Sequence, residues 1–232
     1  MLIINNLQIR RGSVQTGFTI ELPKLALNAG EVMAVRGASG CGKSTILEIL
    51  GLILKPDVLD SYQIGRGDGL CEIAPQVLAQ EQRTLAKLRA EYFGFMLQTG
   101  GLLPFLTVWQ NITLSCDILS KTVDRQWLDN LIEQLNIGHL LMHYPRQLSI
   151  GERQRVSFLR AIAHQPAVLL ADEPTAALDP KNAAVLFDII VKLVRENHLS
   201  ALIVTHDWDL LAGRDIPYIQ GNVSERRAVF GS

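Results

Sequence analysis

The chain has 232 residues, of which 48% are hydrophobic, so it can bury a sizeable core without disulfide bonds. Its formal net charge of −1 provides no field that would attract nucleic acid, and no nucleic-acid partner is expected. The spacing of the three cysteines, Cys41, Cys71 and Cys116, matches neither disulfides nor metal ligands. The first residues lack a signal-peptide pattern, and no apolar run approaches the roughly 18 residues that cross a bilayer. These features are typical of a cytoplasmic globular protein.

The first part of the chain, from Met1 to about Pro56, is expected to form strands that lead into a glycine-rich turn and a helix. An apolar run at 31–36 precedes the turn and a helix-like run at 45–50 follows it. Glycines in this context let backbone N–H groups face one anion, and the helix dipole adds partial positive charge. Lys43 can then reach the terminal phosphates of a nucleotide, and the Ser44 hydroxyl can ligate Mg²⁺. The pattern predicts a phosphate-binding loop for a nucleoside triphosphate, with the residues Gly37, Ala38, Ser39, Gly40, Cys41, Gly42, Lys43, Ser44 and Thr45.

The middle and end of the chain predict further helices and strands. Residues 57–82 are irregular, and Gly65, Gly67 and Gly69 indicate a hairpin turn rather than a second nucleotide site. Residues 81–89 are expected to be helical, and several helices are expected between 102 and 164, including 124–135 and the helix after Gly151. From 166 to 219, apolar strands alternate with helices such as 183–196, as βαβ units require. This order indicates an α/β protein.

Two acidic residues and a histidine follow apolar strands late in the chain. Asp172 ends an apolar run, so its carboxylate is expected at the carboxyl edge of a buried parallel strand, near the phosphates and their Mg²⁺. Glu173 follows it directly, and the alternative that both are solvated acids at a strand end is disfavoured by Pro174 and the downstream Leu178-Asp179 pair. His206 follows the strand-like run 201–204, a position more typical of a turn or surface residue when it is considered alone.

Four segments carry a resemblance to a known family. They are Gln147-Leu-Ser-Ile-Gly-Glu-Arg-Gln-Arg-Val156, Ala171-Asp-Glu-Pro174, Ala177-Leu-Asp179 and Leu202-Ile-Val-Thr-His-Asp207. With the phosphate loop, they make the chain, from about Met1 to about Val223, resemble the nucleotide-binding subunits of ATP-binding cassette (ABC) transporters. The resemblance implies an α/β fold of the P-loop NTPase class, with a RecA-like parallel sheet core, an N-terminal antiparallel β subdomain and an inserted α-helical signature subdomain. It implies one domain over 1–232, with a catalytic core of about 1–98 and 165–232 and a helical subdomain of about 99–164.

The resemblance also implies roles for individual residues. Glu173 corresponds to the general base that polarises the attacking water, and His206 corresponds to the switch histidine that contacts the γ-phosphate. The Mg²⁺ ligands implied are Ser44, Gln98 and Asp172, and Gln98 also links the core to the helical subdomain. The signature residues Ser149, Gly151 and Glu152, together with Asp179, are assigned to the ATP site, where the signature contacts the γ-phosphate bound by the opposite subunit. One loop and one signature per chain therefore imply pairing with a second copy or a paralogue around two ATP molecules.

The chain departs from the family pattern at two places. Ile150 replaces a glycine in the signature, which would be costly if that position required a positive φ. No aromatic residue precedes Gly12, where the family stacks adenine, so Arg11 or Phe18 is the candidate for that contact. Specificity for ATP over GTP cannot be inferred from the loop, because phosphate contacts do not read the base.

An apolar segment after Gln98 is the expected contact with a partner. The range Leu102–Trp109 concentrates large apolar side chains, among them Phe105 and Trp109, some of which are expected to be core. In the family this region grips a short helix of an integral membrane subunit, which would place the chain on the inner face of the cell membrane. The surrounding residues most resemble the lipoprotein-releasing, macrolide-export and cell-division subgroup. The alternatives are a soluble ABC ATPase that remodels a cytosolic partner, and a nucleotide-gated module without hydrolysis, which Glu173 and His206 disfavour. The transported substrate depends on the membrane subunit.

Cys41 lies inside the phosphate loop, beside a helix N-terminus and near Lys43. Such a setting lowers the pKa of a thiol and raises its reactivity. The sequence therefore predicts that alkylating reagents inactivate the protein and that MgATP protects it.

Overall fold

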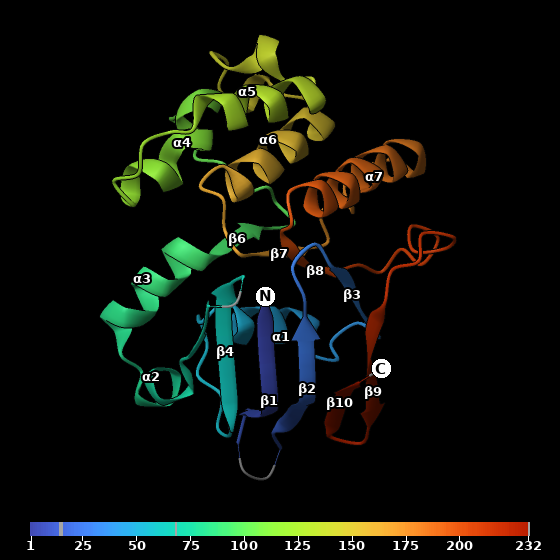
Figure 1. Cartoon of the computed structure of the whole chain (residues 1–232). Coiled ribbons are helices and arrows are strands. Elements are labelled where there is room, and N and C mark those ends of the chain that lie inside the picture. Colours follow the sequence, from blue (N-terminus) through green and yellow to red (C-terminus); the bar gives the residue numbers. More distant parts are fainter. Residues whose placement is uncertain (14–15, 68, 232) are drawn as a thin grey trace.

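The strands of the chain join into a ten-stranded sheet, in the order β5-β4-β1-β2-β10-β9-β3-β8-β7-β6 (Figure 1). The computed structural model describes residues 1–13, 16–67 and 69–231. The strands are β1 Leu2–Arg11, β2 Phe18–Leu27, β3 Val32–Gly37, β4 Ser61–Arg66, β5 Gly69–Glu72, β6 Phe93–Met96, β7 Val168–Asp172, β8 Ser200–Val204, β9 Tyr218–Ser224 and β10 Arg227–Gly231. The helices are α1 Lys43–Leu50, α2 Ala74–Ala79, α3 Gln82–Tyr92, α4 Val108–Ile118, α5 Arg125–Gln134, α6 Ile150–Ile162 and α7 Pro180–Glu196, with short 3₁₀ helices η1 Gly138–Leu140 and η2 Pro145–Gln147.

The sheet has a parallel part and an antiparallel part. Strands β9, β3, β8, β7 and β6 pair in parallel, whereas β2, β1, β4 and β5 pair antiparallel near the N-terminus. Helices α4, α5 and α6 lie together beyond the β6–β7 edge of the sheet, at the top of Figure 1. The predicted α/β fold, with a parallel core, antiparallel N-terminal strands and a helical insertion, is confirmed.

The parallel strands are covered on both faces. In β7, Leu169 and Ala171 join the core cluster that includes α6 and α7, whereas Val168 and Leu170 join the cluster that includes α1. This alternation follows from the period of two along a strand. A strand buried on both faces reads as a continuous apolar run, which is why 167–171 was recognisable in the sequence.

Most of the expected helices begin at capping residues. Asp124 caps α5 by accepting a hydrogen bond from the Trp127 N–H, and Asp179 caps α7 by accepting one from the Asn182 N–H. The helix expected from residue 183 therefore begins earlier, at Pro180, because proline is well tolerated in the first turn. The hairpin expected around Gly65–Gly69 is the β4–β5 pair. The irregular stretch expected over 57–82 was wrong in part, since it also contains helix α2.

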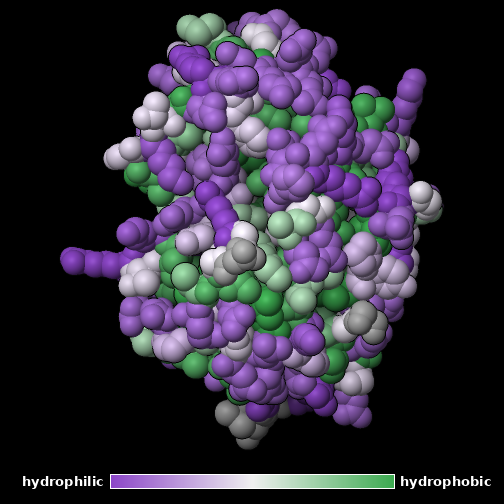
Figure 2. Space-filling view, in the orientation of Figure 1, coloured by the Kyte–Doolittle hydropathy of each residue, from purple (hydrophilic) through white to green (hydrophobic). Residues whose placement is uncertain are grey.

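Figure 2 shows that hydrophilic residues cover most of the visible face, while hydrophobic residues appear mainly near its centre, around the antiparallel strands. In the part of the chain that the structure describes, no helix is both long enough and apolar enough to cross a membrane.

Candidate nucleotide site

The glycine-rich turn connects the end of β3 to the start of α1. Gly42, the residue before α1, has a φ of 102°, a conformation that side chains rarely adopt. A Cβ at Gly42 would also collide with the Ile20 side chain, so glycine is required here on two counts. No side chain caps the N-terminus of α1, so its first N–H groups remain available to an anion.

Lys43 is folded over the turn. Its side chain is 6% exposed, and Nζ donates hydrogen bonds to the carbonyl oxygens of Gly37 and Ala38, each at 2.9 Å. These bonds compensate the cost of burying an ammonium group. They hold a positive charge at the mouth of the loop, where a phosphate can replace the two carbonyls.

The side chains of Ser44 and Asp172 contact each other although the two residues are 128 positions apart in the sequence. The Ser44 hydroxyl donates to Asp172 Oδ2 at 3.0 Å. Asp172 is the last residue of β7, which lies beside β8 in the parallel core. A hydroxyl and a carboxylate are ligands that Mg²⁺ accepts, with nucleotide phosphates and water as the remaining ligands. Among the described residues no group of three or more His, Cys, Asp or Glu side chains could hold a metal ion.

Glu173 and His206 also contact each other. Glu173 has a φ of 48° and donates its N–H to the Val204 carbonyl at 2.9 Å, so the chain turns sharply after β7. Its Oε1 then lies 2.6 Å from His206 Nε2 rather than beside Asp172 Oδ2. A positive φ at glutamate costs about 1–3 kcal/mol, which is the kind of strain that clusters at functional sites. Both side chains line a cavity of about 320 Å³, together with Thr205 and Asp207.

Gln98 lies two residues beyond β6, and Met96 of that strand pairs with Ala171, the neighbour of Asp172. The Gln98 side chain is exposed, and in the described residues it forms no hydrogen bond to Ser44 or Asp172. Its backbone carbonyl accepts a hydrogen bond from Gln154 Nε2 in α6 at 3.0 Å. The residue thus lies at the same sheet edge as Asp172 and is tied to the helix that follows the signature.

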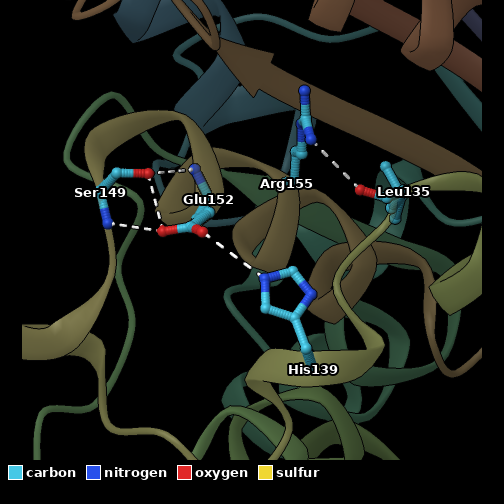
Figure 3. A network of polar contacts seen from close by, with 5 residues as sticks. All are labelled: Leu135, His139, Ser149, Glu152 and Arg155. Atoms are coloured by element: carbon cyan, nitrogen blue, oxygen red, sulfur yellow. Dashed lines mark hydrogen bonds and ion pairs between the residues drawn. The ribbon is translucent and has the colours of Figure 1, made fainter.

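The signature forms the N-terminus of α6 (Figure 3). Ser149 Oγ donates to Glu152 Oε2 at 2.7 Å, and the Ser149 N–H donates to the same oxygen at 2.8 Å. These bonds from Ser149 lower the pKa of Glu152. The His139 ring approaches the other oxygen of Glu152 at 3.8 Å.

Ile150 is the first residue of α6 and has a right-handed helical backbone, so the strain considered for this position does not arise. Its side chain is 53% exposed and points away from the core. Isoleucine is therefore compatible with the signature helix.

Asp179 and Gly151 belong to neighbouring segments. The Asp179 carboxylate accepts hydrogen bonds from the Asn182 side chain at 2.6 Å and its N–H at 3.2 Å, which lower the pKa of Asp179. A Cβ at Gly151 would lie 3.7 Å from Leu178 Cδ2, so the signature borders the 178–179 turn. No hydrogen bond or ion pair between described residues joins the signature to the phosphate loop of the same chain.

Arg11 and Phe18 lie opposite each other in the β1–β2 register. Arg11 is exposed, whereas Phe18 is half-buried and packs against the core. Ile20, two residues after Phe18 in β2, lies beside Gly42 of the loop. The choice between Arg11 and Phe18 for base stacking stays a prediction.

Cys41 is only 2% exposed. Its sulfur is packed between glycines, since Cβ atoms added at Gly37 and Gly221 would lie 2.6 and 3.2 Å from it. This burial opposes the rapid alkylation expected from the sequence, which considered charge and not access.

Two residues near the site carried no signal that we recognised in the sequence. Arg36 directly precedes Gly37, and Trp208 lies two residues after His206. The Arg36 guanidinium carbon lies 4.4 Å from the centre of the Trp208 ring. Their adjacency to two predicted site residues was the available clue.

Comparison with known proteins agrees with this geometry. The ABC transporter family profile matches residues 21–176, a span that includes the phosphate loop, the signature and the Asp172–Glu173 edge. The chain belongs to the ABC transporter family.

Relatives narrow the subgroup. The lipoprotein-releasing system ATP-binding protein LolD of Paramagnetospirillum magneticum is 38% identical over 212 residues, which cover 89% of this chain and 90% of that protein. LolD of Ruegeria sp. is 40% identical over 195 residues, covering 82% of this chain and 81% of that protein. These similarities place the chain among the ATPase subunits of the LolD-like subgroup, and they favour the transporter interpretation over a remodelling ATPase.

Solved structures support the same fold. The dimeric ABC transporter cassette MJ0796 aligns with a TM-score of 0.77 at 28% identity, covering 95% of this chain and 94% of that one. A post-hydrolysis form of that cassette, bound to ADP and Pi, aligns with a TM-score of 0.77 at 26% identity. The alignment covers 98% of this chain and 96% of that one.

Proposed function

We propose that the chain binds MgATP on its phosphate loop, pairs with a second copy or a paralogue around two nucleotides, and uses hydrolysis to drive an integral membrane subunit of a lipoprotein-releasing type of complex. The observation that carries the proposal is the pair of contacts at one sheet edge. Ser44 meets Asp172 at 3.0 Å, and Glu173 meets His206 at 2.6 Å on the adjoining turn. Two acids one residue apart thus serve two different partners.

Phosphate binding would use the loop, Lys43 and the start of α1. The Lys43 ammonium exchanges its two carbonyl partners for the terminal phosphates, and the loop residues 37–45 surround them. Ser44 and Asp172 would hold Mg²⁺, with Gln98 reaching it from the β6 edge. The ion supplies charge neutralisation at the phosphates.

Hydrolysis would use the Glu173–His206 pair. The Glu173 carboxylate accepts a proton from the attacking water, the role of a general base. His206 leaves Glu173 to donate its Nε2–H toward the γ-phosphate, which also holds the water in line. The strained turn at Glu173 directs its carboxylate toward that water and away from the Mg²⁺ ligands.

Dimerisation would complete the site. Ser149 and Gly151 present a hydroxyl and helix N–H groups at an exposed helix start, where an anion is stabilised. We assign the signature, with Glu152 and Asp179, to the nucleotide bound by the partner. The dimeric form of the MJ0796 cassette supports this arrangement.

The membrane subunit would dock on the groove between α3, α4 and α6. This groove has a volume of about 450 Å³, and exposed Leu97 and Ile118 line it. We infer that the chain is peripheral to the inner face of the cell membrane through this contact, and that 99–164 acts as a helical subdomain moving against the core.

The Leu102–Trp109 segment follows Gly100 and Gly101, which line this groove, and its side chains differ in exposure. Phe105 is 71% exposed and is available to a partner helix. Trp109 instead packs against the core, with the Arg125 guanidinium 4.3 Å from its ring centre, so we assign it to the helical packing. The anchor proposed for the membrane subunit is therefore Phe105.

Affinity purification of tagged Glu173→Gln protein in detergent with MgATP tests the proposal. Removing the base traps the ATP-bound dimer and retains its partners. Glu196→Gln is the matched control, because Glu196 is half-exposed and pairs with Lys192 on the exposed side of α7. Recovery of a multi-span membrane protein with Glu173→Gln, and less with the control, is expected. Recovery of soluble proteins alone would instead indicate a remodelling ATPase.

A further inference from the structure

The segment that carries His206 lacks regular structure. It runs from the end of β8 at Val204 to the start of β9 at Tyr218 and contains turns but no helix or strand. Short polar bonds fix its first turn, since the Asp207 N–H donates to Thr205 Oγ1 and the Asp209 N–H donates to Asp207 Oδ1, both at 3.1 Å. These bonds connect His206 rigidly to the residues that follow it, but they do not tie the turn to the sheet.

Arg36 supplies a contact between this segment and the sheet. Its guanidinium carbon lies 4.4 Å from the Trp208 ring centre and 4.0 Å from the Tyr218 ring centre. Arg36 is half-buried, and its Nε is buried without a hydrogen-bond partner. Among the described residues no carboxylate lies within 4.0 Å of this guanidinium, so the two rings are its main partners.

The three residues differ in how firmly the backbone holds them. Arg36 lies in β3, and Tyr218 lies in β9, and these strands pair in parallel with Ala34 opposite Tyr218. Trp208 alone belongs to the irregular segment, and its side chain is half-exposed. The stack therefore attaches a loop residue to two neighbours that the sheet fixes.

We propose that Arg36 and Trp208 are positioning residues for His206. Arg36 directly precedes the phosphate loop at Gly37, and Trp208 follows His206 by two residues, so the stack sets the separation between the histidine and the bound phosphates. The inference rests on the proposed role of His206 in hydrolysis. A cation–π contact on exposed rings such as these shifts the docked population of a loop by about two- to fivefold.

ATPase assays on purified variants test this inference. Trp208→Ala and Arg36→Ala are expected to lower kcat about two- to fivefold while the Kd for MgATP stays unchanged, because the phosphate loop is not altered. Trp208→Phe keeps a ring over the guanidinium and is expected to restore most of the activity. Arg125→Ala is the matched control, since it removes an equivalent stack, on Trp109, outside the nucleotide site.

Combining variants with His206→Ala distinguishes positioning from general destabilisation. If Trp208 acts through His206, Trp208→Ala has no further effect on the residual activity of His206→Ala. A further loss in that background, an equal loss of kcat in Arg125→Ala, or a weakened Kd for MgATP would overturn the inference. Wild-type hydrolysis and its loss in His206→Ala are measured in the same series, so the proposed function is judged separately. Because Trp208 is half-exposed, its variants are expected to fold, and their thermal unfolding is measured in parallel.

Discussion

Glu173 and His206 contact each other at 2.6 Å although they follow different strands of the parallel sheet. The positive φ of Glu173 turns its side chain away from Asp172, which instead accepts the Ser44 hydroxyl. The two adjacent carboxylates therefore face different partners. Asp172, beside Ser44, suits a metal ion, and Glu173, beside His206, suits a proton transfer. This separation is the basis of the mechanism proposed here.

Replacing the base should stop hydrolysis without stopping binding. We expect Glu173→Gln to lower kcat by about 10²- to 10⁴-fold, the usual contribution of a general base, with an unchanged Kd for MgATP. Phosphate release and equilibrium binding measure the two quantities. Unchanged hydrolysis would show that another group accepts the proton.

Replacing the loop lysine should have the opposite effect. Lys43→Met retains the buried stem but removes the charge that faces the phosphates, so the Kd for MgATP is expected to rise at least about tenfold. Lys192→Met, on the exposed side of α7, is the control and should bind normally. Nucleotide binding of Lys43→Met at wild-type affinity would contradict the assignment of the loop.

Asn111 should stabilise the Leu102–Trp109 segment. It is fully buried, accepts the Leu103 N–H at 2.8 Å, and donates to the carbonyls of Leu103, Leu106 and Thr107. Asn111→Ala removes the side-chain partner of the Leu103 N–H and of the Leu106 carbonyl, whereas the Leu103 and Thr107 carbonyls keep backbone donors. The free energy of unfolding is therefore expected to fall by about 2–3 kcal/mol. Urea denaturation measures the free energy of unfolding. The control is Asn130→Ala, at an exposed position, which should change this free energy little.

His164 should make stability depend on pH. Burial lowers its pKa from 6.5 to about 4, while Nε2 is hydrogen-bonded to the Phe93 carbonyl oxygen. Above pH 6.5 both folded and unfolded forms are neutral, and between pH 6.5 and about 4 only the unfolded form binds the proton. The free energy of unfolding should therefore fall by up to about 3 kcal/mol as the pH drops through this window. His164→Gln should weaken this dependence, and His139→Gln, at an exposed site, should preserve it.

Cysteine labelling should follow access rather than charge. Exposed Cys71 is expected to react with iodoacetamide first, and buried Cys41 slowly. Loss of ATPase activity should follow the modification of Cys41, and MgATP should slow both the modification of Cys41 and the loss of activity. Mass spectrometry measures the modification of each cysteine, and ATPase assays on the same samples measure the activity. Inactivation that tracks Cys71, or that saturating MgATP does not slow, would contradict this prediction.

Local patterns predicted much of the fold and of the candidate site. The loop 37–45 was recognisable because glycine spacing and a following helix are local, and Asp172 was recognisable because a buried strand reads as an apolar run. Helix α2 was missed because six residues give too little periodicity.

Features that depend on tertiary contacts were harder to infer. The burial of Cys41 comes from its packing against Gly221, which is distant in sequence. The Arg36–Trp208 stack joins residues from β3 and from the loop after β8, and neither has a spacing that marks it. Whether Trp109 belongs to the core or to a partner contact stayed open in the sequence, because it depends on packing against the core and Arg125.

In the proposed mechanism, two chains close around two ATP molecules through the signature. Sedimentation of Glu173→Gln with MgATP, with bound nucleotide counted in the same fractions, tests it most directly. We expect a dimer with two ATP per dimer, and a monomer when Ser149→Ala is added. A Glu173→Gln protein that binds MgATP tightly yet stays monomeric, or a dimer that persists in Ser149→Ala without nucleotide, would contradict it.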